Sequence, residues 1–288
     1  MDQKFPKIFV IVLNFNGAKT LPGCLASVFQ SDYPNFETVV VDNNSQDGSF
    51  EKARLAYSKA HFIKNSANIG FAKGNNVGIR FALEKFADHI FVLNNDAIIE
   101  NDALSLLAKE AAKNPAAGIF SPIITTANGE DVWFAGGLVD WLGMKNTHIT
   151  KPLAAISYKT DYVSGCAMLI KKDVFKKIGL FDERYFLYYE DADFSLRANK
   201  AGFDLLIVPS VSVRHLEQSN TNNKSKIYWL VLSGLLFFDT HTSWLQKFWT
   251  KPYLMARKIK NLYDLVFSPS DVSRDIRKAY RDYKKIPK

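Results

Sequence analysis

The sequence contains few cysteines and no long apolar segment. Its 288 residues include only Cys24 and Cys166, which excludes a disulfide-dense scaffold and a zinc site built from four cysteines. The longest mostly apolar run, residues 227–238, is shorter than the roughly 18 residues that a membrane-spanning helix needs. Residues 8–13 are too few for a signal-peptide core. We therefore expect a cytoplasmic protein, with peripheral contact at the inner face of the cell membrane left open.

The sequence also lacks the common phosphate-binding loops. The first apolar run is followed by neither G-x-G-x-x-G nor G-x-x-x-x-G-K-[ST], which are the loops of dinucleotide-dependent dehydrogenases and P-loop NTPases. A basic, glycine-rich opening loop of the kind that holds a triphosphate in sugar nucleotidyltransferases is missing as well. These absences exclude the standard forms of three classes of nucleotide-binding enzyme.

Basic charge is unevenly distributed along the chain. The formal net charge is +8, yet residues 245–288 hold 12 of the 37 Lys and Arg residues and only 4 of the 29 Asp and Glu residues. The first 244 residues are therefore formally neutral. A nucleic-acid-binding protein would carry basic and aromatic residues together over a face of the fold. We consequently expect no nucleic-acid partner, despite the basic isoelectric point.

The order of apolar runs and helical patterns indicates an α/β fold. In the first half, strands are predicted at 8–13, 37–42, 61–64 and 89–94, and helices at 18–29, 49–57, 72–86 and 102–112. Such alternation predicts βαβ units and a mainly parallel central sheet flanked by helices. After Pro115 we expect strands at 117–125, 131–137 and 160–170, helices at 172–178 and 191–201, and a strand pair in 203–215 that is broken at Pro209. The remaining residues have a mostly helical pattern.

Polar side chains follow three of the predicted strands. Asn14 ends the first strand, Asp42 ends the second, and Asn94, Asn95 and Asp96 follow the fourth. Asn and Asp are also common turn residues, so one such strand end would mean little. Ligands of open α/β sheets bind outside the carboxyl ends of the strands, and three polar ends on one edge favour a polar ligand site.

Acidic residues and a histidine provide candidates for a metal site and for a catalytic base. Asp96 and the distant His215 suit a divalent cation that keeps several waters and bridges phosphate oxygens. Glu190 and Asp191 suit proton abstraction from a hydroxyl. The alternatives are that His215 is a hydrogen-bonded residue at a strand end, and that the two acids favour a helix N-terminus. The second alternative is compatible with catalysis.

Six ordered motifs carry a resemblance to a known family. They are VIVLNFNG, VVVDNNSQDGS, NSANIGFAKGNNVGI, FVLNNDAII, the long segment from VSGCAMLI to RANKAGF, and VRH. Between about Ile8 and Leu216 the chain resembles family-2 glycosyltransferases, and in particular their rhamnosyltransferase-like members. The resemblance implies a GT-A (Rossmann-like) fold, a nucleotide-diphosphate sugar donor, Mg²⁺ or Mn²⁺, and inversion at the anomeric carbon.

The resemblance also implies roles for residues on the donor side. Leu13 and Asn14 would contact the uracil or thymine base, Asp42 the base or the ribose, and Asn68 the nucleotide. Asn94, Asn95 and Asp96 match the D-x-D element, with Asn95 near the ribose and Asp96 on the metal. His215 would complete the metal and diphosphate site.

On the acceptor side the resemblance implies that Asp191 is the general base, next to Glu190. Gly165 would allow the backbone to approach the donor sugar closely. The aromatic face of Trp133 suits the apolar side of a sugar ring where sugar and acceptor meet, although a tryptophan of the core would satisfy the pattern equally well. We interpret Cys166 as a small buried hydrophobic residue, because this chemistry needs no cysteine nucleophile.

Two departures from the family pattern bear on the site. Asn94 stands where a full D-x-D element has aspartate, which leaves Asp96 and His215 as the predicted metal ligands. Ser233 and Gly234 lie in an apolar segment in which relatives often carry an Arg-Asn pair. The resemblance therefore gives no secure acceptor or diphosphate contacts in that segment.

We expect a catalytic domain in residues 1–220 and a helical, basic extension in residues 221–288. Residues 1–115 would bind the nucleotide, and residues 116–220 would carry the acceptor side and catalysis. In the extension, Met255, Ile259, Leu262 and Val266 form an apolar stripe beside basic residues. Such a helix suits an anionic membrane surface, and the alternative is that the stripe packs on the catalytic domain.

The predicted activity is the transfer of a sugar from dTDP-rhamnose or a UDP-sugar to a hydroxyl of a polysaccharide or lipid-linked oligosaccharide. The alternative is a non-catalytic nucleotide- or carbohydrate-binding relative with the same fold. The presence of Asp96, Asp191 and His215 argues for the enzyme.

Overall fold

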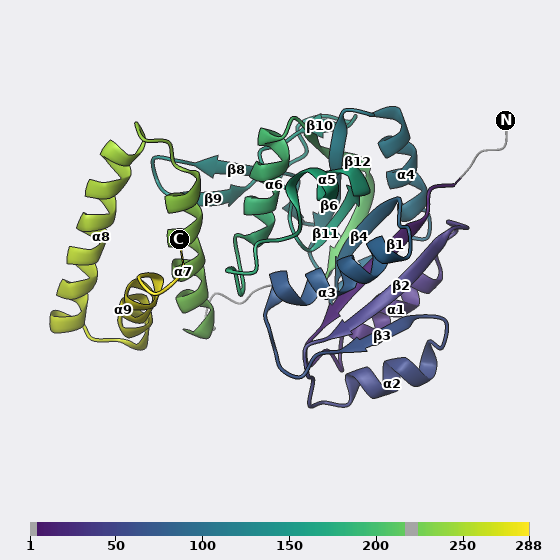
Figure 1. Cartoon of the computed structure of the whole chain (residues 1–288), viewed down its shortest axis with the longest axis horizontal. Coiled ribbons are helices and arrows are strands. Elements are labelled where there is room, and N and C mark those ends of the chain that lie inside the picture. Colours follow the sequence, from purple (N-terminus) through teal and green to yellow (C-terminus); the bar gives the residue numbers. More distant parts are fainter. Residues whose placement is uncertain (1–4, 217–223, 288) are drawn as a thin grey trace.

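The computed structural model describes residues 5–216 and 224–287 (Figure 1). A central sheet is flanked by helices, and three further helices lie beside it. The strands are β1 (Ile8–Asn14), β2 (Phe36–Asp42), β3 (His61–Lys64), β4 (His89–Asn94), β5 (Ala97–Ile99), β6 (Ala117–Thr125), β7 (Val132–Phe134), β8 (Gly137–Asp140), β9 (Lys145–His148), β10 (Tyr158–Lys159), β11 (Ala167–Lys171) and β12 (Asp204–His215). The helices are α1 (Leu21–Phe29), α2 (Ser49–Ala56), α3 (Phe71–Glu84), α4 (Ala103–Lys113), α5 (Lys172–Ile178), α6 (Glu190–Lys200), α7 (Lys224–His241), α8 (Lys247–Phe267) and α9 (Asp271–Tyr283).

The first half forms the predicted βαβ units. Strands β3, β2, β1 and β4 lie in that order and are all parallel. Since such crossovers are right-handed, α1 and α2 cover one face of the sheet and α3 covers the other. The strand order reverses between β1 and β4, which is the point where open α/β sheets bind ligands. The polar ends of these two strands therefore lie at the expected position of a site.

Helix α3 lies unusually close to the strands that it covers. A Cβ atom at Gly78 would lie 2.6 Å from Cγ2 of Ile11, and one at Gly74 would lie 2.6 Å from Cδ1 of Leu13. Glycine at these two positions lets the helix approach β1 without displacing its side chains. The carboxyl end of β1 is thereby held in place against α3.

Beyond β4 the sheet becomes mixed. Strand β11 pairs antiparallel with both β4 and β6, and β12 then runs parallel to β6. The short strands β5, β7 and β10 pair antiparallel with β12, β6 and β12 respectively. The central sheet with flanking helices is as predicted, while antiparallel pairing accounts for the looser pattern after Pro115.

The prediction for residues 203–215 was wrong in one respect. These residues form one long strand, β12, and not a pair broken at Pro209. The register against β6 shifts between Val208 and Ser212, so residues 209–211 bulge out of the ladder. The missing N–H of Pro209 therefore costs no ladder hydrogen bond. The predicted strand at 160–170 also begins later, at Ala167, and the hairpin of β8 and β9 was not predicted.

The three C-terminal helices contact the rest of the molecule through α7 and α8, among other contacts. The Phe237 and Phe238 side chains of α7 are fully buried in the main core. From α8, the indole N–H of Trp249 donates to the Leu142 carbonyl (3.0 Å), and the Tyr253 hydroxyl donates to the Gly143 carbonyl (3.2 Å), both at the tip of the β8–β9 hairpin. No helix in residues 5–216 and 224–287 combines the length and apolarity needed to cross a bilayer. The predicted boundary at residue 220 lies outside the described residues, and the division into two parts stays a prediction.

Candidate functional site

The carboxyl end of β1 is the centre of a polar network. The Asn14 side chain is fully buried and donates to Asp42 Oδ1 (2.8 Å) and to the hydroxyls of Ser45 (3.1 Å) and Ser49 (2.9 Å). Its own oxygen accepts a hydrogen bond from Asn95 Nδ2 (2.9 Å). Residues from the ends of β1, β2 and β4 are thus joined through one amide. Asn14 fixes the edge at which a nucleotide contact is predicted.

Asp42 belongs to the same hydrogen-bond network as Asn14. Its carboxylate is buried and accepts the backbone N–H of Ser45 (2.8 Å) and the Ser45 hydroxyl (2.6 Å). In this conformation it holds the turn after β2, and its contact with a base or ribose stays a prediction. Asn68 is exposed, and its oxygen accepts from Asn43 Nδ2 (3.2 Å) and from Gly70 N (3.0 Å). Asn68 is therefore positioned at the surface of the same edge.

Asp96 and His215 meet although 118 positions separate them. Strand β5 follows directly after Asp96 and pairs with the end of β12, so that Ala97 lies opposite His215. The backbone N–H of Leu216 also donates to the Asp96 carbonyl (2.8 Å). As a result Asp96 Oδ2 lies 3.2 Å from His215 Nε2. The predicted pairing of these two side chains is present in the structure.

The donor set at this pair fits a divalent cation. Asp96 Oδ1 is buried and has no hydrogen-bond partner among the residues that the structure describes, an arrangement that is costly unless a ligand satisfies the oxygen. The Asp96 carboxylate suits Mg²⁺ or Mn²⁺, which would take waters and phosphate oxygens as further ligands, and the His215 imidazole would be the second protein ligand. Within the described ranges, no group of three or more His, Cys, Asp and Glu side chains is arranged to hold a metal.

Trp133 lies beside the same pair. Its ring centroid is 5.0 Å from that of His215 and 4.6 Å from that of His148. The indole is partly buried and also packs on the main core. Both interpretations of Trp133, as a sugar contact and as a core residue, are compatible with this position.

The acidic pair at the start of α6 is held by backbone donors. Asp191 Oδ2 accepts the Gly165 N–H (2.9 Å), and Oδ1 accepts the Ala192 N–H (2.8 Å). Burial raises the pKa of Asp191, and these two hydrogen bonds oppose the rise. Glu190 is 5% exposed, and its Oε2 has no hydrogen-bond partner within residues 5–216 and 224–287. Burial and the neighbouring charge of Asp191 raise the pKa of Glu190 well above its usual value. As the pH rises, the Asp191 carboxyl consequently loses its proton at a lower pH than the Glu190 carboxyl.

Residues 165–166 connect the acidic pair to the D-x-D element. The Cys166 carbonyl accepts the Asn94 N–H (2.9 Å), and the neighbouring Gly165 holds Asp191. A side chain at position 165 would crowd Phe71, because a Cβ would lie 3.1 Å from its ring. The Cys166 thiol is buried, and burial together with the charge of Asp96 raises its pKa well above the usual value. Cys166 is a buried residue, as interpreted, that lies between Asp96 and Asp191.

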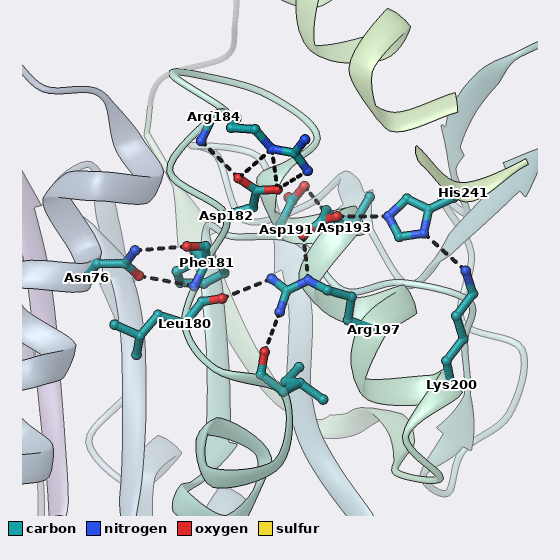
Figure 2. A network of polar contacts seen from close by, with 12 residues as sticks. Asn76, Leu180, Phe181, Asp182, Arg184, Asp191, Asp193, Arg197, Lys200 and His241 are labelled. Atoms are coloured by element: carbon teal, nitrogen blue, oxygen red, sulfur yellow. Dashed lines mark hydrogen bonds and ion pairs between the residues drawn. The ribbon is translucent and has the colours of Figure 1, made fainter. Parts of the chain in front are cut away.

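A second network behind the acidic pair was not predicted (Figure 2). Asp193 of α6 is buried; its Oδ2 accepts from Arg197 Nε (2.8 Å), and its Oδ1 lies 2.8 Å from Nε2 of His241 at the end of α7. Lys200 Nζ lies 3.2 Å from His241 Nδ1. Because an ammonium only donates, Nδ1 accepts and Nε2–H donates to Asp193. A lone histidine far along the chain gave no sequence signal for this link between α6 and α7.

Ser233 and Gly234 of α7, where the family pattern is not followed, contact the segment before α6. The Ser233 hydroxyl donates to the Leu187 carbonyl (2.8 Å). A Cβ at Gly234 would lie 3.3 Å from the ring of Tyr189. These residues support the backbone that leads into Glu190 and Asp191.

Comparison with characterised proteins identifies what the chain is similar to. It is 26% identical over 261 residues to the N-acetylglucosaminyl-diphospho-decaprenol L-rhamnosyltransferase of Mycobacterium tuberculosis, covering 82% of this chain and 85% of that protein. It is 26% identical over 209 residues to the dTDP-rhamnosyl transferase RfbF of Shigella flexneri, covering 72% and 68%.

Solved structures show the same fold at low sequence identity. A structure of GalNAc-T7 with UDP, GalNAc and Mn²⁺ matches with a TM-score of 0.70 and 16% identity, over 98% of this chain and 55% of that longer chain. The mannosyltransferase PcManGT of Pyrobaculum calidifontis, in complex with GDP-Man and Mn²⁺, matches with a TM-score of 0.63 and 17% identity, over 99% and 77%. The central sheet with its flanking helices is thus of the GT-A type. The family model described as glycosyl transferase family 2 matches residues 9–179, more than half of the sequence. The chain belongs to glycosyl transferase family 2.

Proposed function

We propose that this glycosyltransferase moves a sugar from dTDP-rhamnose or a UDP-sugar to a hydroxyl of a polysaccharide or lipid-linked oligosaccharide, with inversion at the anomeric carbon. The observation that carries the proposal is the link through residues 165–166. The Gly165 N–H donates to Asp191, and the Cys166 carbonyl accepts from Asn94, two residues before the Asp96 that pairs with His215. The names of the Mycobacterium and Shigella relatives support rhamnose as the sugar.

Asp191 acts as the general base in this proposal. Its hydrogen bonds to two backbone N–H groups fix the carboxylate and leave lone pairs for a further proton. As the acceptor oxygen forms its bond to the anomeric carbon, its proton passes to Asp191. The bond from that carbon to the diphosphate oxygen breaks on the opposite face, and its electron pair leaves with the diphosphate. Because burial and the charge of Asp191 raise the pKa of Glu190 well above its usual value, the proposal assigns the ionised role to Asp191.

Asp96 and His215 would hold the divalent cation, with Asp96 Oδ1 as the oxygen that lacks a partner. When bound, the cation supplies Lewis-acid stabilisation of charge on the leaving diphosphate. Asn14, Asp42 and Asn68 would shape the nucleotide edge. Trp133 would face the sugar, because its ring lies beside His215.

A panel of nucleotide sugars tests the proposal. We expect one UDP- or dTDP-sugar to raise the melting temperature in the presence of Mn²⁺, and to be cleaved to its nucleoside diphosphate, faster when an N-acetylglucosamine-diphosphate lipid is added. Chromatography of the released nucleotide measures both rates. A donor that binds and is never cleaved, with or without acceptor, would indicate the non-catalytic alternative.

The proposal includes docking of α8 on an anionic membrane. The predicted stripe is open to solvent in the structure, with Met255 61%, Ile259 60%, Leu262 44% and Val266 69% exposed. It does not pack on the catalytic part, which was the alternative. Trp244, Phe248 and Trp249 extend the exposed apolar surface at the start of α8, and the exposed Lys251 and Lys260 lie on the same helix. Apolar surface of this extent flanked by cations is typical of helices that lie in a membrane interface.

Removing the stripe should weaken membrane binding. We expect Met255→Ser/Ile259→Ser/Val266→Ser to reduce binding to phosphatidylglycerol vesicles by about tenfold or more, because each side chain loses apolar surface that the interface would bury. Co-sedimentation measures the bound fraction. Leu55→Ser/Phe86→Ser removes equally exposed apolar side chains elsewhere (84% and 86% exposed) and serves as the control. Equal binding of the stripe variant and the unaltered protein would refute the docking.

A further inference from the structure

A cavity of about 470 Å³ lies between the β8–β9 hairpin and the three C-terminal helices. Its size is in the range of sites for small molecules. The α7 side of the cavity is apolar and includes Leu230, Val231, Leu235 and Phe238. None of the predicted donor, metal or base residues lines it, so it is separate from the nucleotide edge.

The charge in this cavity has one sign. Lys145 of β9 and Arg257 and Lys260 of α8 line it, and no aspartate or glutamate of the described residues does. Lys260 is paired with Asp264 (2.8 Å). For Lys145 and Arg257 the described part of the chain contains no ion-pair partner, while Arg257 lies over the Tyr253 ring at 5.8 Å. Two uncompensated cations beside an apolar wall form a setting that an anionic group would satisfy.

One residue, Tyr189, connects the cavity to the proposed base, Asp191. Tyr189 lines it and immediately precedes Glu190 and Asp191. The Tyr189 backbone is left-handed (φ 67°), and its ring lies against Gly234 of α7. Burial raises the pKa of the Tyr189 hydroxyl, and the nearby positive charge of Arg257 opposes the rise. A molecule in the cavity would therefore lie on the acceptor side of the site, next to the start of α6.

Apolar surface continues from the mouth of the cavity. Leu230 lines the cavity and is 49% exposed, and α8 carries on its solvent side the apolar stripe described above. A water-soluble glycan would gain nothing from such surroundings. A ligand with a phosphate group and an apolar chain would satisfy both the cations and the apolar wall.

We propose that this cavity binds the phosphate-bearing lipid end of the acceptor, with Lys145 and Arg257 on the phosphate oxygens and the lipid chain against α7. The identification of this ligand as the acceptor rests on the proposed glycosyltransferase function, whereas binding of a lipid phosphate in the cavity does not. It places the lipid phosphate beside Tyr189, so that the sugar attached to the phosphate extends toward Asp191. It selects lipid-linked acceptors over free polysaccharide for this chain.

Binding of short isoprenoid probes to the full chain, without membranes, tests the cavity. We expect isothermal titration calorimetry to give at least about tenfold tighter binding for farnesyl diphosphate than for farnesol or inorganic pyrophosphate, because each of these lacks half of the recognised chemistry. Equal affinity for pyrophosphate would reduce the cavity to an anion site and overturn the proposal. Equal affinity for farnesol would overturn it as well.

A variant that lacks the Lys145 and Arg257 charges tests the proposed phosphate contacts, with a matched control. We expect Lys145→Gln/Arg257→Gln to weaken farnesyl diphosphate binding by about 10-fold or more, since hydrogen bonds to charged groups are lost. Lys251→Gln, on the same helix but outside the cavity, should stay within about twofold. Both variants should keep the melting temperature of the unaltered protein, as these side chains are exposed.

Unchanged affinity of the double variant would refute the site. Donor cleavage is measured on the same samples and separates the two ideas. Cleavage without farnesyl diphosphate binding would overturn the cavity and leave the function intact. Binding without cleavage of any donor would support the cavity and count against the proposed function.

Discussion

Asp191→Asn should lower the rate of sugar transfer by about 10²–10⁴-fold, the usual contribution of a general base, while leaving donor affinity within about twofold. Asparagine can still accept one of the two backbone hydrogen bonds that hold position 191, but it cannot take the acceptor proton. Transfer is measured by product formation at saturating donor, and donor affinity by calorimetry. Transfer at the normal rate in this variant would remove Asp191 from the mechanism.

The pH dependence of the transfer rate is a second test of Asp191 as the general base. Burial raises the pKa of Asp191 above that of an ordinary aspartate, and the base must be ionised to act. Activity should therefore rise with pH through this elevated pKa, and the residual activity of the asparagine variant should lack that limb. A buried group whose folded pKa exceeds its unfolded pKa costs stability once pH exceeds both values. The variant should accordingly melt no lower than the unaltered protein at pH 7.5.

Glu190→Gln is the matched control. Burial and the charge of Asp191 raise the pKa of Glu190 well above its usual value, so replacement by a neutral amide of similar shape should change transfer by only about threefold at neutral pH. Some loss of thermal stability is expected, because the Oε2 position has no partner that an amide could use. A strong loss of transfer in Glu190→Gln together with an active Asp191→Asn would reverse the two roles.

The parallel half of the fold could be predicted because local and global signals agree there. β1, β2 and β4 each contain an apolar run that is followed by Asn or Asp, and the structure begins and ends them within one residue of the prediction. The hairpin of β8 and β9 could not be found in this way. Lys145–His148 contains no apolar residue, and its pairing depends on long-range contact with Gly137–Asp140. The strand break predicted at Pro209 was wrong, because the effect of a proline depends on the register of β12 against β6. The sequence alone does not give that register.

The candidate site shows the same division. Asp96 and His215 could be paired from motifs, since each follows a recognisable strand. The contact of Gly165 with Asp191 and the link from Asp193 to His241 depend on where α6 lies relative to residue 165 and to α7. The cationic cavity depends on α8 lying across the hairpin. Composition located the basic charge in the last 44 residues, but only the packing of these helices places Arg257 near Tyr189.

Asp96→Asn should weaken Mn²⁺-dependent donor binding by at least about tenfold. Loss of residues that merely support a metal ligand typically costs 10–100-fold in metal affinity, and Asp96 is proposed as a direct ligand whose Oδ1 has no other partner in the described part of the chain. Calorimetric titration of dTDP and UDP, with Mn²⁺ and with EDTA, measures the effect. In EDTA the variant and the unaltered protein should bind the nucleotide equally.

The controls for Asp96 separate coordination from general electrostatics. Glu100→Gln removes an exposed carboxylate four residues away and should leave both titrations unchanged. His215→Ala should reproduce the Mn²⁺-specific loss, because His215 Nε2 is the second proposed metal ligand. This nitrogen lies 3.2 Å from Asp96 Oδ2. If Asp96→Asn weakens binding equally with Mn²⁺ and with EDTA, the carboxylate serves the β5–β12 junction and not a cation. The β5–β12 pairing brings these two side chains together in either case, so the Mn²⁺ dependence alone decides between a metal site and a structural ion pair.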